Sequence, residues 1–341
     1  MTRPAIDPAL TAIVRDPLWF PDRYDPGQDA FHFRRLTRET HRAATFLTDE
    51  YLPTGAAPVV IRRADALAAD PPRAPLHFIF HSAFCCSTLL ARAFDIPGVA
   101  MGLKEPVLLN DLVGWQHRGG SARQIAAVLD DGLALLARPF APGEAVVVKP
   151  SNLANGMAPA ILTMRADSRA LLLHAPLKVF LGSVARKGMD GRLWVRDLLV
   201  KQLREGLHPF GFKGEDYLGQ TDLQVAAMGW LAQHALFARM AAQFPGRVTS
   251  LDSERLLADP SAALARLSAL FGIALDVPAV MAGPVFPRHS KLGGEFTADD
   301  RKAVQAEEAV HADEIGKAVI WTEAVAKAAG VPMILPAPLL G

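Results

Sequence analysis

The sequence predicts an α/β protein with a parallel sheet of about five strands flanked by helices. From residue 76 onward, short apolar runs of strand length alternate with longer helical stretches, which is the pattern of βαβ units. The chain has 341 residues, of which 50% are hydrophobic and 21% charged, so it can bury a sizeable core. Disordered, collagen-like and coiled-coil classes are excluded.

Residues 1–70 are expected to form a mainly helical extension packed on the core. Apolar and small side chains share one helical face there until Pro53 ends the pattern: Leu36, Thr40, Ala43, Ala44 and Leu47. Residues 71–341 are expected to form the α/β domain, with helical additions at its C-terminal end. We therefore expect a single domain overall.

The strands are predicted at residues 76–80, 99–103, 145–148, 170–173 and 248–251. A helix is predicted over residues 222–243, whose apolar stripe includes His234 as a core residue. In open parallel sheets, ligands gather at the carboxyl ends of the strands. Functional residues are thus expected directly after the strands.

Charge and cysteine content exclude several classes of function. The 36 Lys and Arg residues nearly balance the 35 Asp and Glu residues, so no global basic field exists to attract nucleic acid. Cys85 and Cys86 are the only cysteines, which excludes a disulfide scaffold and favours small packing side chains over a metal site. No apolar run approaches the roughly 18 residues of a membrane span, and a cytoplasmic location is the default expectation.

The loop after the first predicted sheet strand is suited to anion binding. Residues 78–92 run from a buried strand through small residues into a helix, with Ser87 and Thr88 at its start. Such a loop presents backbone N–H groups and the positive end of a helix dipole. It lacks the Gly-x-x-x-x-Gly-Lys-Ser/Thr pattern, which disfavours an ATP or GTP hydrolase. An ordinary capped helix is the alternative interpretation.

Several segments, in the correct order, resemble the sulfotransferases that use 3′-phosphoadenosine-5′-phosphosulfate. The stretch 87–90, Ser-Thr-Leu-Leu, is similar to the end of that family's phosphosulfate loop. Glu105-Pro106 looks like its Glu-Pro element, and Lys149 like its strand-end lysine. Residues 171–183 resemble its strand and helix for the 3′-phosphate, and 251–260 its Glu-x-Leu-x-x-Asp-Pro segment.

The resemblance implies a P-loop-like fold, the phosphosulfate as donor co-substrate, and no metal. Residues 288–294 resemble the family's basic closing loop over the 3′-phosphate. The cofactor-binding residues implied are Phe84, Cys85, Cys86, Ser87, Thr88, His174, Ser183, Arg186, Arg288 and Lys291.

The sequence departs from the family pattern at four of these positions, one of which is Ser183, which sits one residue late if Pro176 is the anchor. Phe84 stands where the family has a loop Lys or Arg, and Cys86 where it has a Gly. His174 stands where it has the 3′-phosphate Arg. Residues 165–204 carry nine Lys or Arg against three Asp, and we expect either anion ligands or a solvated helix face there.

Sulfuryl transfer needs fixed cations and N–H donors for the charge that spreads over the transferring oxygens. Lys149 is the expected stabilising residue, and a lysine pointing to solvent is the alternative. Glu105 is the expected base for the acceptor, with a turn carboxylate before Pro106 as the alternative. His81 is a second candidate base or cation, or else a capping histidine.

The function predicted is sulfuryl transfer to a hydroxyl or amine of a small-molecule or glycan acceptor. A catalytically silent member of the fold that binds a nucleotide or a partner is one alternative, and a phosphotransferase is another. No nucleic-acid partner and no membrane span are expected, and the oligomeric state is left open.

Overall fold

The computed structural model describes residues 7–286 and 311–340. The chain divides into two compact units, which are described separately. Unit 1 comprises Met1–Ile79, Thr88–Arg169 and Phe271–Leu275; unit 2 comprises Phe80–Ser87, Ala170–Leu270 and Asp276–Gly341. Within the described ranges, no helix is both long and apolar enough to cross a membrane.

A five-stranded parallel sheet has the strand order β5-β6-β4-β7-β8. The five predicted strands are confirmed, each ending one residue later than predicted: β4 Leu76–His81, β5 Ala100–Lys104, β6 Ala145–Lys149, β7 Ala170–His174 and β8 Val248–Asp252. All residues of the first four are buried, as their apolar runs predict. The strand order reverses at β4.

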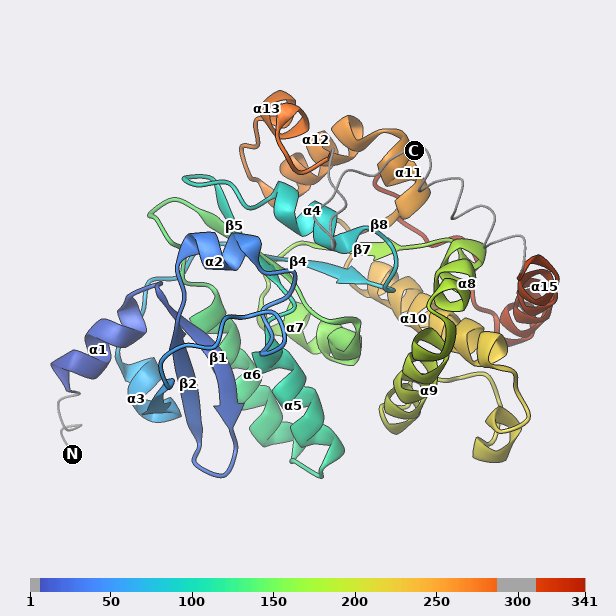
Figure 1. The fold of residues 1–341 in the computed structure, drawn as a ribbon, viewed down its shortest axis with the longest axis horizontal. Coiled ribbons are helices and arrows are strands. Elements are labelled where there is room, and N and C mark those ends of the chain that lie inside the picture. Colours follow the sequence, from blue (N-terminus) through green and yellow to red (C-terminus); the bar gives the residue numbers. More distant parts are fainter. Residues whose placement is uncertain (1–6, 287–310, 341) are drawn as a thin grey trace. The chain divides into compact units, whose positions relative to one another are not determined.

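The helices of unit 1 include α4 Ser87–Ala93, α5 Val107–His117, α6 Ala122–Leu136 and α7 Ala158–Met164. Helix α5 packs on α6, and both contact β1 (Trp19–Asp25), as Figure 1 shows. Behind β5, the α4 backbone comes so close that a Cβ on Gly102 would lie 2.4 Å from the Ala91 carbonyl oxygen. Only glycine fits this contact.

The N-terminal extension is mixed, so the expectation of a mainly helical segment was wrong. It contains the antiparallel sheet β1-β2-β3, with β2 at Ala30–Arg35 and β3 at Val59–Arg62. Its helices are short: α1 Pro8–Arg15, α2 Arg38–Ala43 and α3 Arg63–Ala68. The strands form because their aromatic side chains, among them Phe31 and Phe33, are buried together in unit 1.

Unit 2 is largely helical beyond its two sheet strands. Helix α10 covers Asp222–Gln243, the predicted bounds, and packs on α8 (Leu177–Arg186), α9 (Gly188–Arg204) and α15 (Ala312–Ala329). His234 is fully buried on α10, as predicted, and stacks on Trp230 with 3.8 Å between ring centroids.

The described part of unit 2 also contains shorter helices, namely η2 Gly214–Tyr217, α11 Ser253–Ala258, α12 Pro260–Phe271 (its last residue in unit 1) and α13 Val277–Ala282. The segment after α15 returns to β8, where the Ser250 amide donates to the Ala337 carbonyl at 2.8 Å. The Leu339 amide donates to the Ser250 carbonyl at the same distance, which covers the edge of the sheet.

Candidate active site

The loop between β4 and α4 adopts an unusual backbone conformation. Ala83, Phe84 and Cys86 have φ angles of 70°, 51° and 62°, in the left-handed region that disfavours non-glycine residues. Such strain persists only where the surroundings enforce it. The Ser82 amide donates to the Leu173 carbonyl at 3.1 Å, which ties the loop to the end of β7.

His81 takes part in the same loop as a hydrogen-bond acceptor. Its Nδ1 accepts the Ala83 amide at 3.1 Å, so the imidazole holds the turn that follows β4. Cys85 is buried with its Sγ 3.5 Å from the Leu173 carbonyl oxygen, as expected of a packing side chain, whereas Cys86 is only partly buried.

Phe84 lies among aromatic rings with a cation beside it. Its ring centroid is 5.7 Å from that of Phe180 and 5.5 Å from that of Trp194. The Lys187 ammonium lies 5.9 Å from the Phe84 centroid. Lys187, at the junction of α8 and α9, therefore places a cation beside Phe84, the loop position where the resemblance implies a Lys or Arg.

Ser183 and Arg186, two predicted cofactor-binding residues, contact each other on α8. The Arg186 Nη2 donates to the Ser183 Oγ at 3.0 Å. Ser183 lies one helical turn beyond Phe180, whose ring meets Phe84. Ser183 and Arg186 therefore lie on the same helix that contacts the loop through Phe180.

His174 ends β7 in a buried position. It meets His234 edge to face, with 4.9 Å between centroids, and burial lowers the pKa of its imidazole. The side chain is therefore neutral at pH 7. Its assignment to the 3′-phosphate stays a prediction.

Other residues of the basic segment 165–204 form ion pairs with acidic side chains. Arg196 Nε lies 2.6 Å from Asp222 Oδ1, and Arg192 lies 3.4 Å from the same carboxylate. Arg192 also pairs with Glu314 at 3.5 Å. Because these two arginines are already paired within the protein, they favour the interpretation of a solvated helix face over that of anion ligands. The predicted residues Arg288 and Lys291 lie outside the described residues.

Glu105 and Lys149 form an ion pair at the carboxyl ends of β5 and β6. The Lys149 side chain is 1% exposed and that of Glu105 17% exposed. The alternative of a lysine pointing to solvent is thus wrong. Glu105 has a φ of 52°, so this non-glycine residue, like Ala83, Phe84 and Cys86, is held in the left-handed region.

Leu47 brackets the Glu105 turn with two backbone hydrogen bonds. Its amide donates to the Lys104 carbonyl at 2.7 Å, and its carbonyl accepts from the Val107 amide at 3.1 Å. The Glu105 amide in turn donates to the Lys149 carbonyl at 2.7 Å. The backbone of the turn that carries the carboxylate is therefore fixed from the N-terminal extension as well as from the sheet.

Lys104, beside Glu105 in sequence, points to a different partner. Its buried ammonium donates to the carbonyls of His41 at 2.6 Å and Arg42 at 3.1 Å, at the C-terminal end of α2. Burial, with Arg92 nearby, lowers the pKa of Lys104 to about 7. This leaves Lys149 as the cation on Glu105.

Two aromatic residues adjoin this ion pair that sequence reasoning missed. The Lys149 ammonium lies 5.0 Å from the Phe46 ring centroid, and Tyr51 meets Phe46 edge to face at 5.1 Å. The pKa of the Tyr51 hydroxyl is raised by burial and by the charges of Glu50 and Glu105. No spacing rule connects residues 46 and 51 to a lysine at 149, so the sequence carried no signal for this contact.

Comparison with solved structures finds chains that are similar to this one. Three similar structures are sulfotransferases. The sulfotransferase domain from the curacin biosynthetic pathway is 17% identical with a TM-score of 0.41, over 65% of this chain and 81% of that one. The sulfotransferase domain from the Synechococcus PCC 7002 olefin synthase is 13% identical with a TM-score of 0.40, over 67% and 84%.

The third structure is a sulfotransferase from Alicyclobacillus acidocaldarius, 16% identical with a TM-score of 0.36, over 70% of this chain and 92% of that one. No protein-family model and no curated protein sequence matches the chain. In the parts of the chain that the structure describes, no group of three or more His, Cys, Asp or Glu residues could hold a metal ion.

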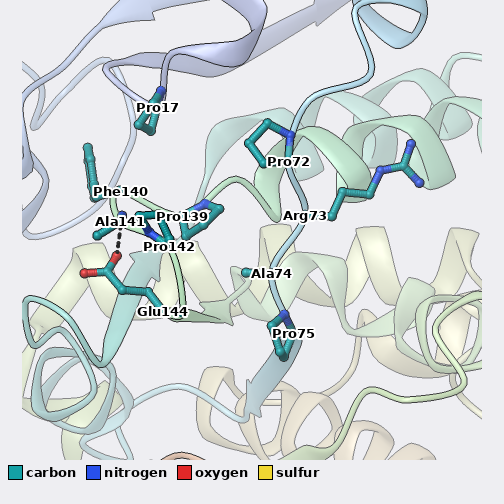
Figure 2. A pocket seen from close by; sticks show the side chains of 11 residues that line it. Pro17, Pro72, Arg73, Ala74, Pro75, Pro139, Phe140, Ala141, Pro142 and Glu144 are labelled. Atoms are coloured by element: carbon teal, nitrogen blue, oxygen red, sulfur yellow. Dashed lines mark hydrogen bonds between the residues drawn. The ribbon is translucent and has the colours of Figure 1, made fainter.

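A cavity of about 350 Å³ lies in unit 1, at the opposite ends of the same strands. Figure 2 shows it beside Pro75 and Glu144, which directly precede β4 and β6. The buried Glu144 carboxylate accepts from Arg38 Nη1 at 2.5 Å and from the Gly98 amide at 2.7 Å. The Glu144 carboxylate already has hydrogen-bond partners, and the cavity lies at the amino ends of the strands, opposite to the ends where ligands bind in such sheets. This cavity is therefore not the candidate active site.

Proposed function

We propose that the protein transfers a sulfuryl group from 3′-phosphoadenosine-5′-phosphosulfate to a hydroxyl or amine of a small-molecule or glycan acceptor. The observation that carries the proposal is the Glu105–Lys149 ion pair at two adjacent strand ends, with Glu105 in a strained backbone conformation. A buried ammonium held on a carboxylate is a preorganised charge, which costs little reorganisation when the reaction needs it.

The two residues take complementary roles in this reaction. Glu105 accepts the proton of the acceptor as the acceptor atom bonds to sulfur. The bond between sulfur and the phosphate oxygen breaks, and 3′,5′-adenosine bisphosphate leaves. Once Glu105 is protonated its charge no longer neutralises Lys149, so the ammonium stabilises the negative charge that develops on the leaving oxygen.

Donor binding is assigned to the loop and to α8. A backbone that passes through the left-handed region at Ala83, Phe84 and Cys86 suits the binding of an anion by successive N–H groups. Ser87 and Thr88 follow at the helix start, and Lys187 supplies charge beside Phe84. Ser183 and Arg186 are assigned to the 3′-phosphate because their side chains already form a polar pair.

Nucleotide binding without transfer is the second candidate. It is favoured by the neutral, buried His174 and by the uncharged Phe84, at two positions where the resemblance implies a cation. A silent protein would bind the bisphosphate yet release no sulfated product from any acceptor.

Ligand-dependent thermal unfolding tests the proposal. We expect 3′,5′-adenosine bisphosphate to raise the free energy of unfolding by about 2.7 kcal/mol at a hundred times its Kd, and ATP with Mg²⁺ to do so much less. Arg186→Ala should weaken the bisphosphate effect, while Arg192→Ala, whose guanidinium is already paired with Asp222, serves as the matched control. Equal stabilisation by both nucleotides, or by neither, would contradict the proposal.

A further inference from the structure

A loop of the N-terminal extension covers the Glu105–Lys149 pair. This covering loop comprises residues 44–52, between α2 and β3. Phe46 places its ring 5.0 Å from the Lys149 ammonium, and Tyr51 packs edge to face on Phe46. All of these residues belong to unit 1.

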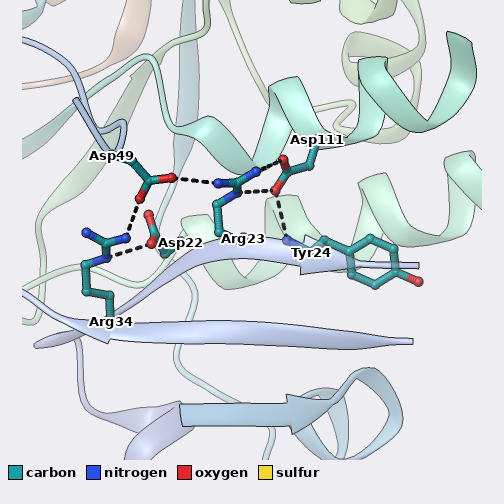
Figure 3. A network of polar contacts seen from close by, with 6 residues as sticks. All are labelled: Asp22, Arg23, Tyr24, Arg34, Asp49 and Asp111. Carbon is teal, nitrogen blue, oxygen red and sulfur yellow. Dashed lines mark hydrogen bonds and ion pairs between the residues drawn. The ribbon is translucent and has the colours of Figure 1, made fainter. Parts of the chain in front are cut away.

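Two arginines of the antiparallel sheet hold the tip of this loop at Asp49. Arg23 on β1 donates from Nη1 to Asp49 Oδ2 at 2.7 Å, and Arg34 on β2 donates from Nη2 to Oδ1 at 2.5 Å. Figure 3 shows the carboxylate between the two guanidinium groups. Each carboxylate oxygen therefore has its own charged donor.

Each arginine is in turn oriented by a second carboxylate. Arg34 Nε donates at 2.7 Å to Asp22, whose side chain is 1% exposed. Arg23 binds Asp111 on α5 through Nε at 2.8 Å and Nη2 at 2.7 Å. The guanidinium groups are thus held in place independently of Asp49. The network therefore fixes the position of the loop more firmly than an isolated surface ion pair would.

We propose that the covering loop is a positioning element of the reaction, in which Asp49, clamped by Arg23 and Arg34, keeps Phe46 against the Lys149 ammonium. The catalytic part of this inference rests on the proposed function; the structural part does not. A lysine has a flexible stem and a strongly hydrated head. The ring attracts the cation and excludes water from it, so the ammonium stays on Glu105.

Lys104 provides an internal comparison for this arrangement. It ends β5 where Lys149 ends β6, the two are register partners, and both are buried. Its ammonium is held by the carbonyls of His41 and Arg42. Disturbing Phe46 should therefore release Lys149 and leave Lys104 in place.

Amine acylation of the full chain, read residue by residue by mass spectrometry, tests the structural part. We expect Phe46→Leu to raise acylation of Lys149 about tenfold, Asp49→Asn to raise it less, and Phe46→Tyr to restore protection, with Lys104 unchanged in all. Glu50→Gln, which removes the neighbouring charge of the same loop, is the matched control. Unchanged Lys149 in Phe46→Leu, or a parallel rise at both lysines, would overturn the inference.

Steady-state kinetics with an authentic acceptor test the catalytic part. Phe46→Leu and Asp49→Asn should lower kcat while the KM for the donor stays near that of the unaltered protein, and Phe46→Tyr should recover kcat. Wild-type protein without transfer activity would contradict the proposed function and leave the acylation result to decide the positioning. Normal kcat in Phe46→Leu with active wild type would overturn the positioning alone.

Discussion

Glu105 combines two features at a single residue. Its backbone lies in the left-handed region, which costs a non-glycine residue roughly 1–2 kcal/mol, and its carboxylate binds the buried Lys149 ammonium. A glycine would meet the backbone requirement without strain. A carboxylate at this strained position indicates that the residue serves through its side chain and not through its ability to form the turn.

The first prediction separates chemistry from binding at these two residues. Lys149→Ala should lower turnover by about 10²-fold or more, the cost of losing one preorganised donor. Glu105→Gln should also lower turnover. Neither should change the affinity for 3′,5′-adenosine bisphosphate, measured by calorimetry, because that product lacks the sulfuryl group.

Glu105→Gly is the structural control for this pair. Because glycine accepts a φ of 52°, the variant should remain folded and yet lose turnover. Full activity in Glu105→Gln would refute the base assignment and make His81 the next candidate. Unfolding of all three variants would identify Glu105 and Lys149 as structural residues.

At the scale of elements, the sheet could be read from the sequence because four of its five strands are short, largely apolar runs buried on both faces. The same holds for α10, whose apolar residues recur at helical spacing over its whole length. The strands of the extension could not, because β1 contains Pro21 and its register shifts beside it. Leu47 fitted a helical face yet lies in the covering loop.

Glu105 and Lys149 were predictable because they directly follow apolar strand runs, and adjacent strand ends meet. Phe46 and Asp49 were not, and neither was the contact of Lys187 with Phe84, because these contacts arise from packing between segments far apart in the chain. A single sequence contains no spacing that encodes such a contact. Sequence reasoning therefore placed both residues at neighbouring strand ends, but it predicted neither their ion pair nor the surroundings of that pair.

The second prediction concerns the close approach of α4 to β5. Gly102→Ala should destabilise the protein by about 1–3 kcal/mol or more, since the added Cβ meets a backbone carbonyl that cannot rotate away. Gly316→Ala in α15, where a Cβ meets nothing within 4 Å, should stabilise by about 0.5–1 kcal/mol. Chemical denaturation measures the free energy of unfolding of both variants. Unchanged stability in Gly102→Ala would show that α4 and β5 leave room for a Cβ at this contact.

Across the molecule, several imidazoles are buried in uncharged form. Burial lowers the pKa of His41 to about 3 and those of His77 and His208 to about 4, and it lowers the pKa values of His174 and His234 as well. These residues lie in both units. Acid should therefore weaken each unit.

The third prediction is the sign of this pH dependence. Below pH 6.5 the unfolded chain protonates its histidines while the folded chain does not until about pH 4, so the free energy of unfolding falls as pH falls. A histidine whose pKa is lowered from 6.5 to about 4 in the folded protein reduces the free energy of unfolding by about 3 kcal/mol at pH 4. His41→Phe, between the rings of Phe20 and Phe140, should reduce the slope in denaturation curves from pH 7 to 4. Parallel curves for the two proteins would refute the assignment of His41.

The Leu47 bracket changes how a minimal fragment that retains the candidate site should be defined. The sequence alone places the start of the α/β domain at residue 71, and a fragment that begins there would keep every strand of the parallel sheet. It would lose the two hydrogen bonds on either side of Glu105 and the ring that shields Lys149. A boundary drawn from the sheet therefore cuts through the candidate site, and the smallest fragment that keeps the Glu105–Lys149 pair with its surroundings includes the N-terminal extension.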